Sequence, residues 1–210
     1  MKKLMATFGV GLLGISAAFA QQDIVTFSSA SSLYQSINQG GGSSTVGYEF
    51  NVTSPITVTG LSAFTADPAA GLNVNTSVGL WDASQNLLAQ ATILAGTTDP
   101  LTSDGFFRYT TLSTPITLQD GTYYVGAEFT AGVDRFTGAV PGLSTMSGVT
   151  YDSAAFALSS SLTFPSFTFS SFNGFFGGNV VATPAPEPES IMLLSMGLVG
   201  VVAFGRKKLL

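Results

Sequence analysis

The chain of 210 residues contains no cysteine and no histidine. These absences exclude thiol nucleophiles, Ser-His and Cys-His catalysis, disulfide bonds and the usual zinc and copper ligand sets. Charged residues make up only 9% of the chain, against about a quarter in an average globular protein. The net charge of −5 argues against a nucleic-acid partner, because phosphate neutralisation needs lysine and arginine. The length allows one ordinary domain.

Positive charge is scarcest in the middle of the chain. Between Gln21 and Thr183 there are ten acidic residues and no lysine, and the only basic residues are Arg108 and Arg135, so this segment has a net charge of −8. Such a surface is typical of a protein that stays dispersed outside the cell and is repelled by anionic surfaces. It could also attract divalent cations.

The amino-terminal segment 1–20 has the features of a secretory signal peptide. It begins with two lysines, continues with an apolar stretch and ends with the small residues Ala18 and Ala20 on either side of a phenylalanine. This pattern predicts removal by signal peptidase between Ala20 and Gln21. The alternative is an uncleaved membrane anchor, which the short apolar core disfavours.

The carboxyl-terminal segment 191–210 predicts a single membrane-spanning helix. An apolar run over 191–205 would measure roughly 22 Å as a helix, against a hydrocarbon core of about 30 Å, and snorkelling basic side chains can cover part of the difference. Arg206, Lys207 and Lys208 follow at once and would stay cytoplasmic. Both ends then place the intervening chain on the far side of the inner membrane.

The residues before this helix complete a recognisable arrangement. Pro186, Glu187 and Pro188 lie in a Pro/Glu-rich linker over 182–190, directly ahead of the apolar run and its basic end. This order resembles the PEP-CTERM sorting signal of Gram-negative bacteria. The resemblance implies recognition and cleavage by an exosortase, in bacteria that export polysaccharide and form biofilm or floc. The alternative is a simple anchor that is never processed.

The segment 21–181 predicts an all-β domain. Short runs of β-branched and aromatic residues recur between turn residues at intervals of about 8–15 positions, which favours a single antiparallel β-sandwich of jelly-roll type. In 46–50, alternate residues put Val46, Tyr48 and Phe50 on one face. The only stretch with helical spacing is 30–39, and the glycines that follow would end it. The predicted strands are 46–50, 56–58, 61–65, 77–81, 87–93, 106–111, 116–118 and 122–129.

Phenylalanine is concentrated between Gly132 and Gly178. Phe167 and Phe169 alternate with polar residues, as in a half-buried strand. The rings in this region would close the core of the sandwich. The alternative is an exposed aromatic platform for sugar rings or for self-association.

Ordered short motifs in the middle of the chain support the same fold. Gly79-Leu80-Trp81-Asp82, Gly121-Thr122-Tyr123-Tyr124-Val125 and Phe175-Phe176-Gly177-Gly178-Asn179 follow one another along the segment. They resemble the DUF4082 type of β-sandwich domain, which is common in PEP-CTERM proteins. The resemblance supports the fold and carries no catalytic residues.

Catalytic chemistry finds little support in this composition. A glycosidase needs two carboxyl groups flanking the scissile bond, and the exported segment offers only Glu49 and Glu128 besides its aspartates. Both lie on polar faces of predicted strands, where solvation explains them. A serine hydrolase would need a base, and the segment has neither histidine nor lysine. We therefore expect no enzyme activity.

Calcium is the one cofactor that the composition permits, because loop aspartates and carbonyls supply oxygen ligands. Asp99 and Asp104 lie five positions apart in one predicted loop and Asp67 lies in another, although no EF-hand pattern is present. These aspartates could equally be solvated turn residues. Trp81, the only tryptophan, is expected in the core, with stacking on a carbohydrate ring as the alternative.

The expectation is therefore an exported, non-enzymatic protein that passes transiently through the inner membrane to the cell surface or extracellular matrix. Its role would be structural or adhesive within exopolysaccharide or biofilm. A carbohydrate-binding module, assisted or not by calcium, is the alternative, and a glycoside-processing enzyme comes third. The expected partners are signal peptidase, an exosortase and possible matrix polysaccharide, with no nucleic acid.

Overall fold

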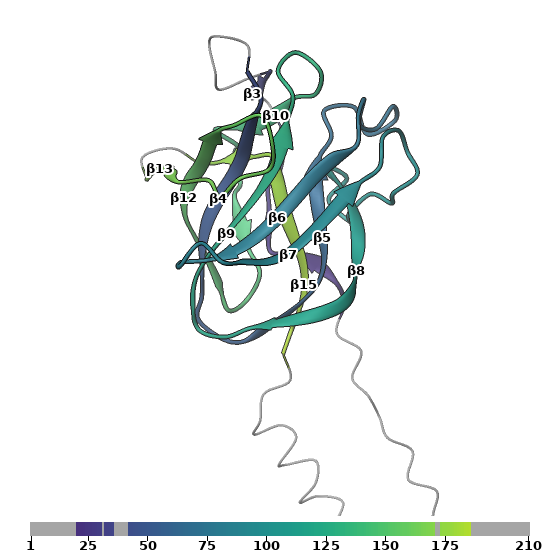
Figure 1. The fold of residues 1–210 in the computed structure, drawn as a ribbon. Helices are drawn as coiled ribbons and strands as arrows, with labels where there is room; N and C mark the ends of the chain where they lie inside the picture. Colours follow the sequence, from purple (N-terminus) through teal and green to yellow (C-terminus); the bar gives the residue numbers. More distant parts are fainter. Residues whose placement is uncertain (1–19, 31, 36–41, 171–172, 186–210) are drawn as a thin grey trace, which may run out of the picture.

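The computed structural model describes residues 20–30, 32–35, 42–170 and 173–185. Every regular element in this part of the chain is a β-strand, which confirms the all-β prediction (Figure 1). The strands are β1 (Gln22–Asp23), β2 (Val25–Thr26), β3 (Ser32–Tyr34), β4 (Ser44–Val52), β5 (Ile56–Phe64), β6 (Thr76–Asp82), β7 (Leu87–Ile93), β8 (Phe107–Leu118), β9 (Gly121–Phe129), β10 (Phe136–Gly138), β11 (Ser144–Thr145), β12 (Val149–Leu158), β13 (Phe167–Phe169), β14 (Phe175–Phe176) and β15 (Gly178–Pro184).

Two large sheets form the body of the domain. One has four strands in the order β1-β15-β5-β8, and the other has six in the order β13-β12-β4-β9-β6-β7. All their pairings are antiparallel. Two small sheets, β14-β10-β3 and β11-β2, complete the fold. The narrower jelly-roll assignment stays a prediction.

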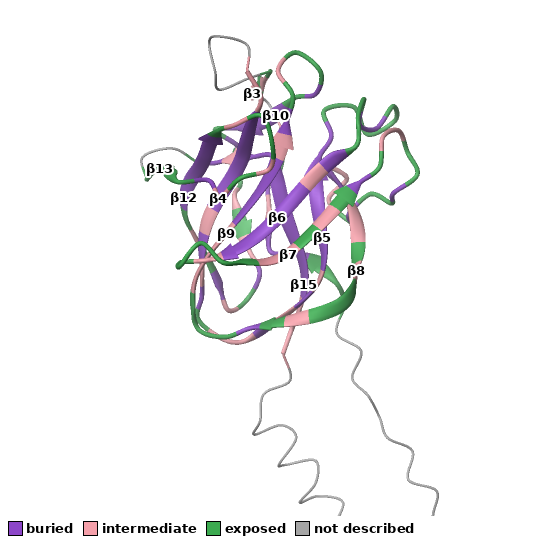
Figure 2. Cartoon of the chain, in the orientation of Figure 1, coloured by how far each residue is buried: buried purple, intermediate pink, exposed green. Residues whose placement is uncertain are grey.

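The core lies between the facing sides of the two large sheets (Figure 2). Val46, Tyr48 and Phe50 of β4 are fully buried, whereas Glu49 between them points to the opposite face and is partly exposed. The alternation predicted for this strand is confirmed. Burying large apolar side chains on one face of each sheet is the main favourable term in such a fold.

The two large sheets approach each other closely where β14 runs into β15. A Cβ atom on Gly177 would lie 2.7 Å from the carbonyl oxygen of Val46, and one on Gly178 would lie 2.8 Å from the carbonyl carbon of Gly126. Both obstacles are backbone atoms, which cannot move aside. Glycine at these two positions therefore sets how closely the sheets pack.

Most predicted strands are found, some of them longer than expected. The predicted strands 56–58 and 61–65 form one strand, β5, and 106–111 and 116–118 form β8. The hairpin of β6 and β7 matches its prediction, and Asp82 closes its turn by accepting hydrogen bonds from the backbone N–H groups of Ser84 and Asn86.

The helix expected over 30–39 is wrong where the structure describes it. Ser32–Tyr34 forms strand β3 and pairs with β10, so Leu33 lies opposite Thr137. Stacking of Tyr34 on Phe136, with ring centroids 5.7 Å apart, supports this pairing. The long strand β12 is not among the predicted strands, because three of its ten residues are alanine and its second half lacks an alternating polar and apolar pattern.

The first and last strands of the domain are neighbours. Gln22 of β1 pairs with Ala182 of β15, so the chain enters and leaves at adjacent positions in one sheet. The predicted signal peptide up to residue 19, the sorting residues Ala18, Pro186, Glu187, Pro188, Arg206, Lys207 and Lys208, and the helix over 191–205 lie outside the described residues. Within the described ranges, no helix is long and apolar enough to cross a membrane.

Candidate functional site

The two ends of the sandwich differ in what they carry. Along β5, Ile56 pairs with Pro184 at the end where the chain leaves, and Ala63 pairs with Gly178 at the other end. Ile56 and Ala63 are seven positions apart along β5, which separates these ends by roughly 23 Å. The β5–β6 loop over 65–75 begins at this second end, opposite the point where the chain leaves (Figure 1).

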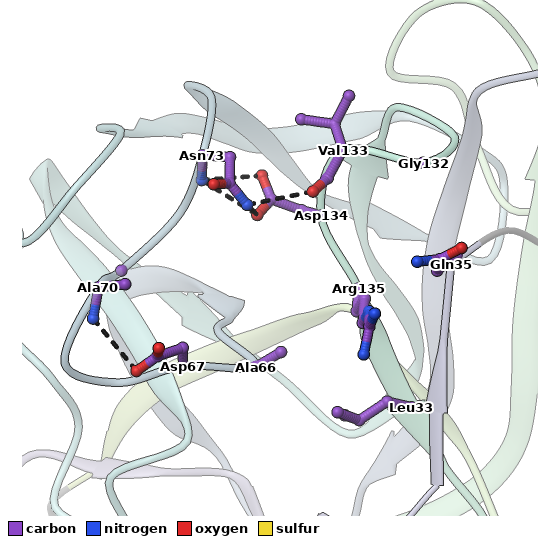
Figure 3. A pocket seen from close by; sticks show the side chains of 11 residues that line it. Leu33, Gln35, Ala66, Asp67, Ala70, Asn73, Gly132, Val133, Asp134 and Arg135 are labelled. Carbon is purple, nitrogen blue, oxygen red and sulfur yellow. Dashed lines mark hydrogen bonds between the residues drawn. The ribbon is translucent and has the colours of Figure 1, made fainter.

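A pocket of about 430 Å³ opens at this loop end (Figure 3). It is lined by three segments: 33–35 at the end of β3, 66–73 of the β5–β6 loop, and 132–135 between β9 and β10. We call it the loop-end pocket. Its side chains are mainly polar: Gln35, Asp67, Asn73, Asp134 and Arg135.

Asp134 and Asn73 hold two of these segments together. The carboxylate of Asp134 accepts hydrogen bonds from the backbone N–H of Asn73 (3.0 and 3.1 Å), from its side-chain amide (2.8 Å) and from the backbone N–H of Val74. The amide of Asn73 also donates to the carbonyl of Val133. A carboxylate that accepts this many N–H bonds fixes the loops that shape the pocket.

The two arginines of the exported segment have different roles. Arg108 is buried, with 4% of its surface exposed. Its guanidinium donates hydrogen bonds to the backbone carbonyls of Pro68 and Asp99 and thereby connects the two loops that contain them. Arg135 is exposed and lines the loop-end pocket. Arg135 is thus the only exposed cationic side chain among the residues that the structure describes.

The three aspartates proposed for calcium do not form one site. Asp67 accepts from the backbone N–H groups of Ala69 and Ala70, which stabilises its own turn. Asp99 accepts from Leu94 N–H and the Thr110 hydroxyl. Within the described ranges, no three acidic residues lie together as a possible metal site. The carboxylates of Asp67 and Asp99 accept their hydrogen bonds mainly within their own loops, and calcium binding at these residues stays a prediction.

Asp104 instead lies near an aspartate that the sequence analysis did not select. Asp23 of β1 is only 3% exposed, and neither of its carboxylate oxygens has a hydrogen-bond partner. Burial and the nearby negative charge of Asp104 raise the pKa of Asp23 to about 8, an effect that the Thr102 hydroxyl only partly offsets. No local pattern could reveal this pair, because its members are 81 positions apart.

Trp81 is buried on the outer face of the six-stranded sheet. Only 5% of its surface is exposed, and its ring lies over Gly79, whose Cβ would come within 2.4 Å of the indole. Phe164 contacts it edge-on, with ring centroids 6.2 Å apart. The expectation of a buried tryptophan agrees with this position, and no indole face is left open for a sugar ring.

The two glutamates considered for catalysis lie on the same outer face but apart. Glu128 of β9 pairs with Thr45 of β4, four residues from Glu49, which is roughly 13 Å along the strand. Glycosidase carboxyl groups are about 5–9.5 Å apart. Glu49 also accepts a hydrogen bond from the Ser153 hydroxyl, and burial together with Glu49 raises the pKa of Tyr124 to about 12.

An exposed aromatic ledge lies at the edge of the same sheet. Phe167 and Phe169 of β13 are 56% and 48% exposed, and both rings stack on Phe156, at 5.3 and 5.5 Å between centroids. The expected strand is present, but its two phenylalanines are not half-buried as expected. β13 is an edge strand, and no other described strand pairs with its outer side.

These features define the class of protein: an all-β domain of facing antiparallel sheets, with its ends together and a polar pocket in the opposite loops. The comparisons with known proteins identify it further. Residues 33–179 match the family model described as "Domain of unknown function (DUF4082)", and the chain belongs to this family. Residues 184–208 match the PEP-CTERM protein-sorting motif. Both resemblances seen in the sequence are confirmed.

Other comparisons add little. No curated protein matches the chain. Two solved structures of infectious bursal disease virus are similar: the VP2 subviral particle, at 13% identity and a TM-score of 0.27, and virus-derived T=1 particles, at 11% and 0.26. They cover 96% and 88% of this chain, which spans about half of each viral chain (54% and 46%). At these TM-scores the likeness supports no argument.

Proposed function

We propose that this domain serves as a non-enzymatic structural or adhesive component of the extracellular polysaccharide matrix. The PEP-CTERM motif implies that the protein is exported and sorted by an exosortase to the cell surface. The proposal rests on one observation: the sorting segment and the loop-end pocket lie at opposite ends of the domain. The sorting segment follows β15 at one end of the sheet, and the loop-end pocket lies at the other end, with roughly 23 Å of strand β5 between the two ends.

This arrangement suits a protein that is attached through its carboxyl-terminal segment and binds its partners at the end of the domain with the loop-end pocket. While the carboxyl-terminal segment holds the chain at the membrane, the end with the loops would face outward. Loops supported on a rigid sandwich are the usual place for binding residues. The net charge of −8 over 21–183 would keep the domains apart from one another and from anionic lipid.

A non-enzymatic role is supported by the arrangement of the acidic groups. Glu49 and Glu128 are too far apart for paired-carboxylate catalysis, and the carboxylates of Asp67, Asp99 and Asp134 accept hydrogen bonds from backbone N–H groups. Histidine and cysteine are absent from the whole sequence. These facts favour a protein that acts by binding through its surface and not by catalysis.

The proposal is tested in the native host by deleting the gene and restoring it with defined variants. We expect the intact exported chain to begin at Gln21 and end near Pro186, with its abundance in the matrix fraction dependent on the exosortase. Deletion should weaken cell aggregation or the matrix. A variant with both prolines of the motif changed, Pro186→Ala with Pro188→Ala, should remain in the membrane and fail to restore aggregation. A deletion strain with an unchanged matrix would refute the structural role.

Carbohydrate binding is the second candidate, and the loop-end pocket favours it. Planar polar side chains such as Gln35, Asn73 and Arg135 suit sugar hydroxyls, and the Arg135 guanidinium would pair with the carboxylate of an acidic sugar. Titration calorimetry of the purified protein with host polysaccharide would show saturable binding. We expect at least tenfold weaker binding for Arg135→Gln and unchanged binding for Asp120→Asn, an exposed control. Equal affinity of all three proteins would remove the pocket from consideration.

A further inference from the structure

The most unusual group in the described structure is the side chain of Asp23 in β1. It is 97% buried, and both its carboxylate oxygens lack a hydrogen-bond partner. Nearby, Asp104 Oδ2 is equally shielded from solvent and equally without a partner. Burying a carboxylate without compensation is costly, so two such groups close together require an explanation.

Asp23 lines a cavity of about 300 Å³ with Gln21, Thr102 and Tyr109. The Thr102 hydroxyl donates to Asp104 Oδ1 at 2.7 Å, which connects the second carboxylate to the cavity wall. No arginine lines the cavity, since Arg108 donates to loop carbonyls instead. The site thus brings together oxygen atoms and negative charge without a positive partner from the described chain.

We propose that this cavity binds a divalent cation, Ca²⁺, held between the carboxylates of Asp23 and Asp104. Both ligands are hard oxygen donors, the class that Ca²⁺ prefers, and no nitrogen or sulfur ligand is at hand. The Thr102 hydroxyl and backbone carbonyls of the cavity wall could complete the coordination. Burial and the charge of Asp104 hold the pKa of Asp23 near 8, and a bound cation would remove this penalty.

Two carboxylates indicate modest affinity. Extracellular calcium modules bind in the range of about 10⁻⁴ to 10⁻³ M, which suits a protein that meets calcium only after export. The bound ion would tie β1 to the loop between β7 and β8, which contains Asp104. Because β1 pairs with β15, the ion would also secure the strand that precedes the sorting motif.

The test is calcium-dependent stability of the full chain, purified in detergent. Unfolding is followed by fluorescence of Trp81, the only tryptophan, in EDTA or in CaCl₂ with ionic strength matched by NaCl. We expect CaCl₂ at a hundred times the dissociation constant to raise Tm by about 5–10 °C. Titration calorimetry should show one site. Asp23→Asn should abolish the shift and the binding heat, while Asp120→Asn, an exposed control outside the cavity, should keep both.

Asp104→Asn provides a second test in case Asp23→Asn does not fold, and it should weaken binding at least tenfold. Absence of binding heat and of a Tm shift in the unchanged chain up to 10 mM CaCl₂ would overturn the proposal. So would a calcium response that persists in both aspartate variants, because the ion would then bind elsewhere.

Discussion

Asn179 connects the two sheets, and replacing it should cost far more than removing one hydrogen bond. Its side chain is fully buried. Its Oδ1 accepts from the Tyr48 hydroxyl on the opposite sheet and from Val180 N–H (2.8 Å), and its Nδ2 donates to the carbonyl of Val25 (2.8 Å). Burial raises the pKa of Tyr48 well above its usual value, so the phenol remains a neutral donor.

The magnitude follows from the groups that would lose their partner. Asn179→Ala leaves the Tyr48 hydroxyl and the Val25 carbonyl buried and unpaired, at about 1–3 kcal/mol each, so we expect a loss of about 4 kcal/mol. Tyr48→Phe removes a single donor, and Asn179 Oδ1 keeps its bond from Val180 N–H. That change should cost only about 1–1.5 kcal/mol.

The assay is urea unfolding of the parent, both single variants and the double variant, followed by circular dichroism and tryptophan fluorescence. The double variant should lose less than the sum of the single losses, because the two residues share one hydrogen bond. Gln90→Ala, on the exposed side of β7, serves as a control within about 0.5 kcal/mol of the parent. A loss for Asn179→Ala no larger than for Tyr48→Phe would refute the reasoning.

Three further changes test other parts of the fold. Gly178→Ala should destabilise by about 2–3 kcal/mol in urea unfolding, because the new Cβ would meet β9 backbone at 2.8 Å; a neutral effect would show that the sheets can separate. Phe164→Ala should expose Trp81 and shift its emission to longer wavelength with stronger acrylamide quenching, and an unchanged spectrum would contradict the contact. The Asn86 side chain lowers the pKa of Asp82, so the stability linked to this carboxylate is present at neutral pH and fades in acid. Asn86→Ala should raise that pKa in an NMR titration, and no change would exclude the side-chain bond as its cause.

The local pattern of apolar and polar residues was sufficient to predict the fold class and many of the strands. In β4 the alternation of Val46, Tyr48 and Phe50 with polar residues already identifies the buried face, because side chains in a strand point alternately to its two sides. The turn between β6 and β7 was predictable from Asp82 and Asn86 for a similar reason. These signals depend only on neighbours in the chain.

Where the hydrophobic pattern gave a wrong prediction, the structure depends on pairing with strands that are distant in the sequence. The spacing of Leu33 and Tyr34 suited a helix, but pairing with β10 more than 100 positions away makes the segment a strand. Phe167 and Phe169 alternate as a half-buried strand would, yet their strand lies at an open edge of the sheet. Hydrophobic periodicity carries no information on which strand lies at an edge.

The export and sorting signals and the kind of fold can be read from the sequence, because sorting motifs and strand patterns are short and local. Which charged groups meet depends on the tertiary structure. In the described part of the chain Asp23 lies near Asp104, whereas Asp67, Asp99 and Asp104 do not come together as a group of three. The tertiary structure also turns Arg108 inward and leaves Arg135 at the loop-end pocket. Contacts of this kind follow from the order of the strands and from the close approach of the two sheets at Gly177 and Gly178. The strand order and the sheet packing both depend on the whole chain.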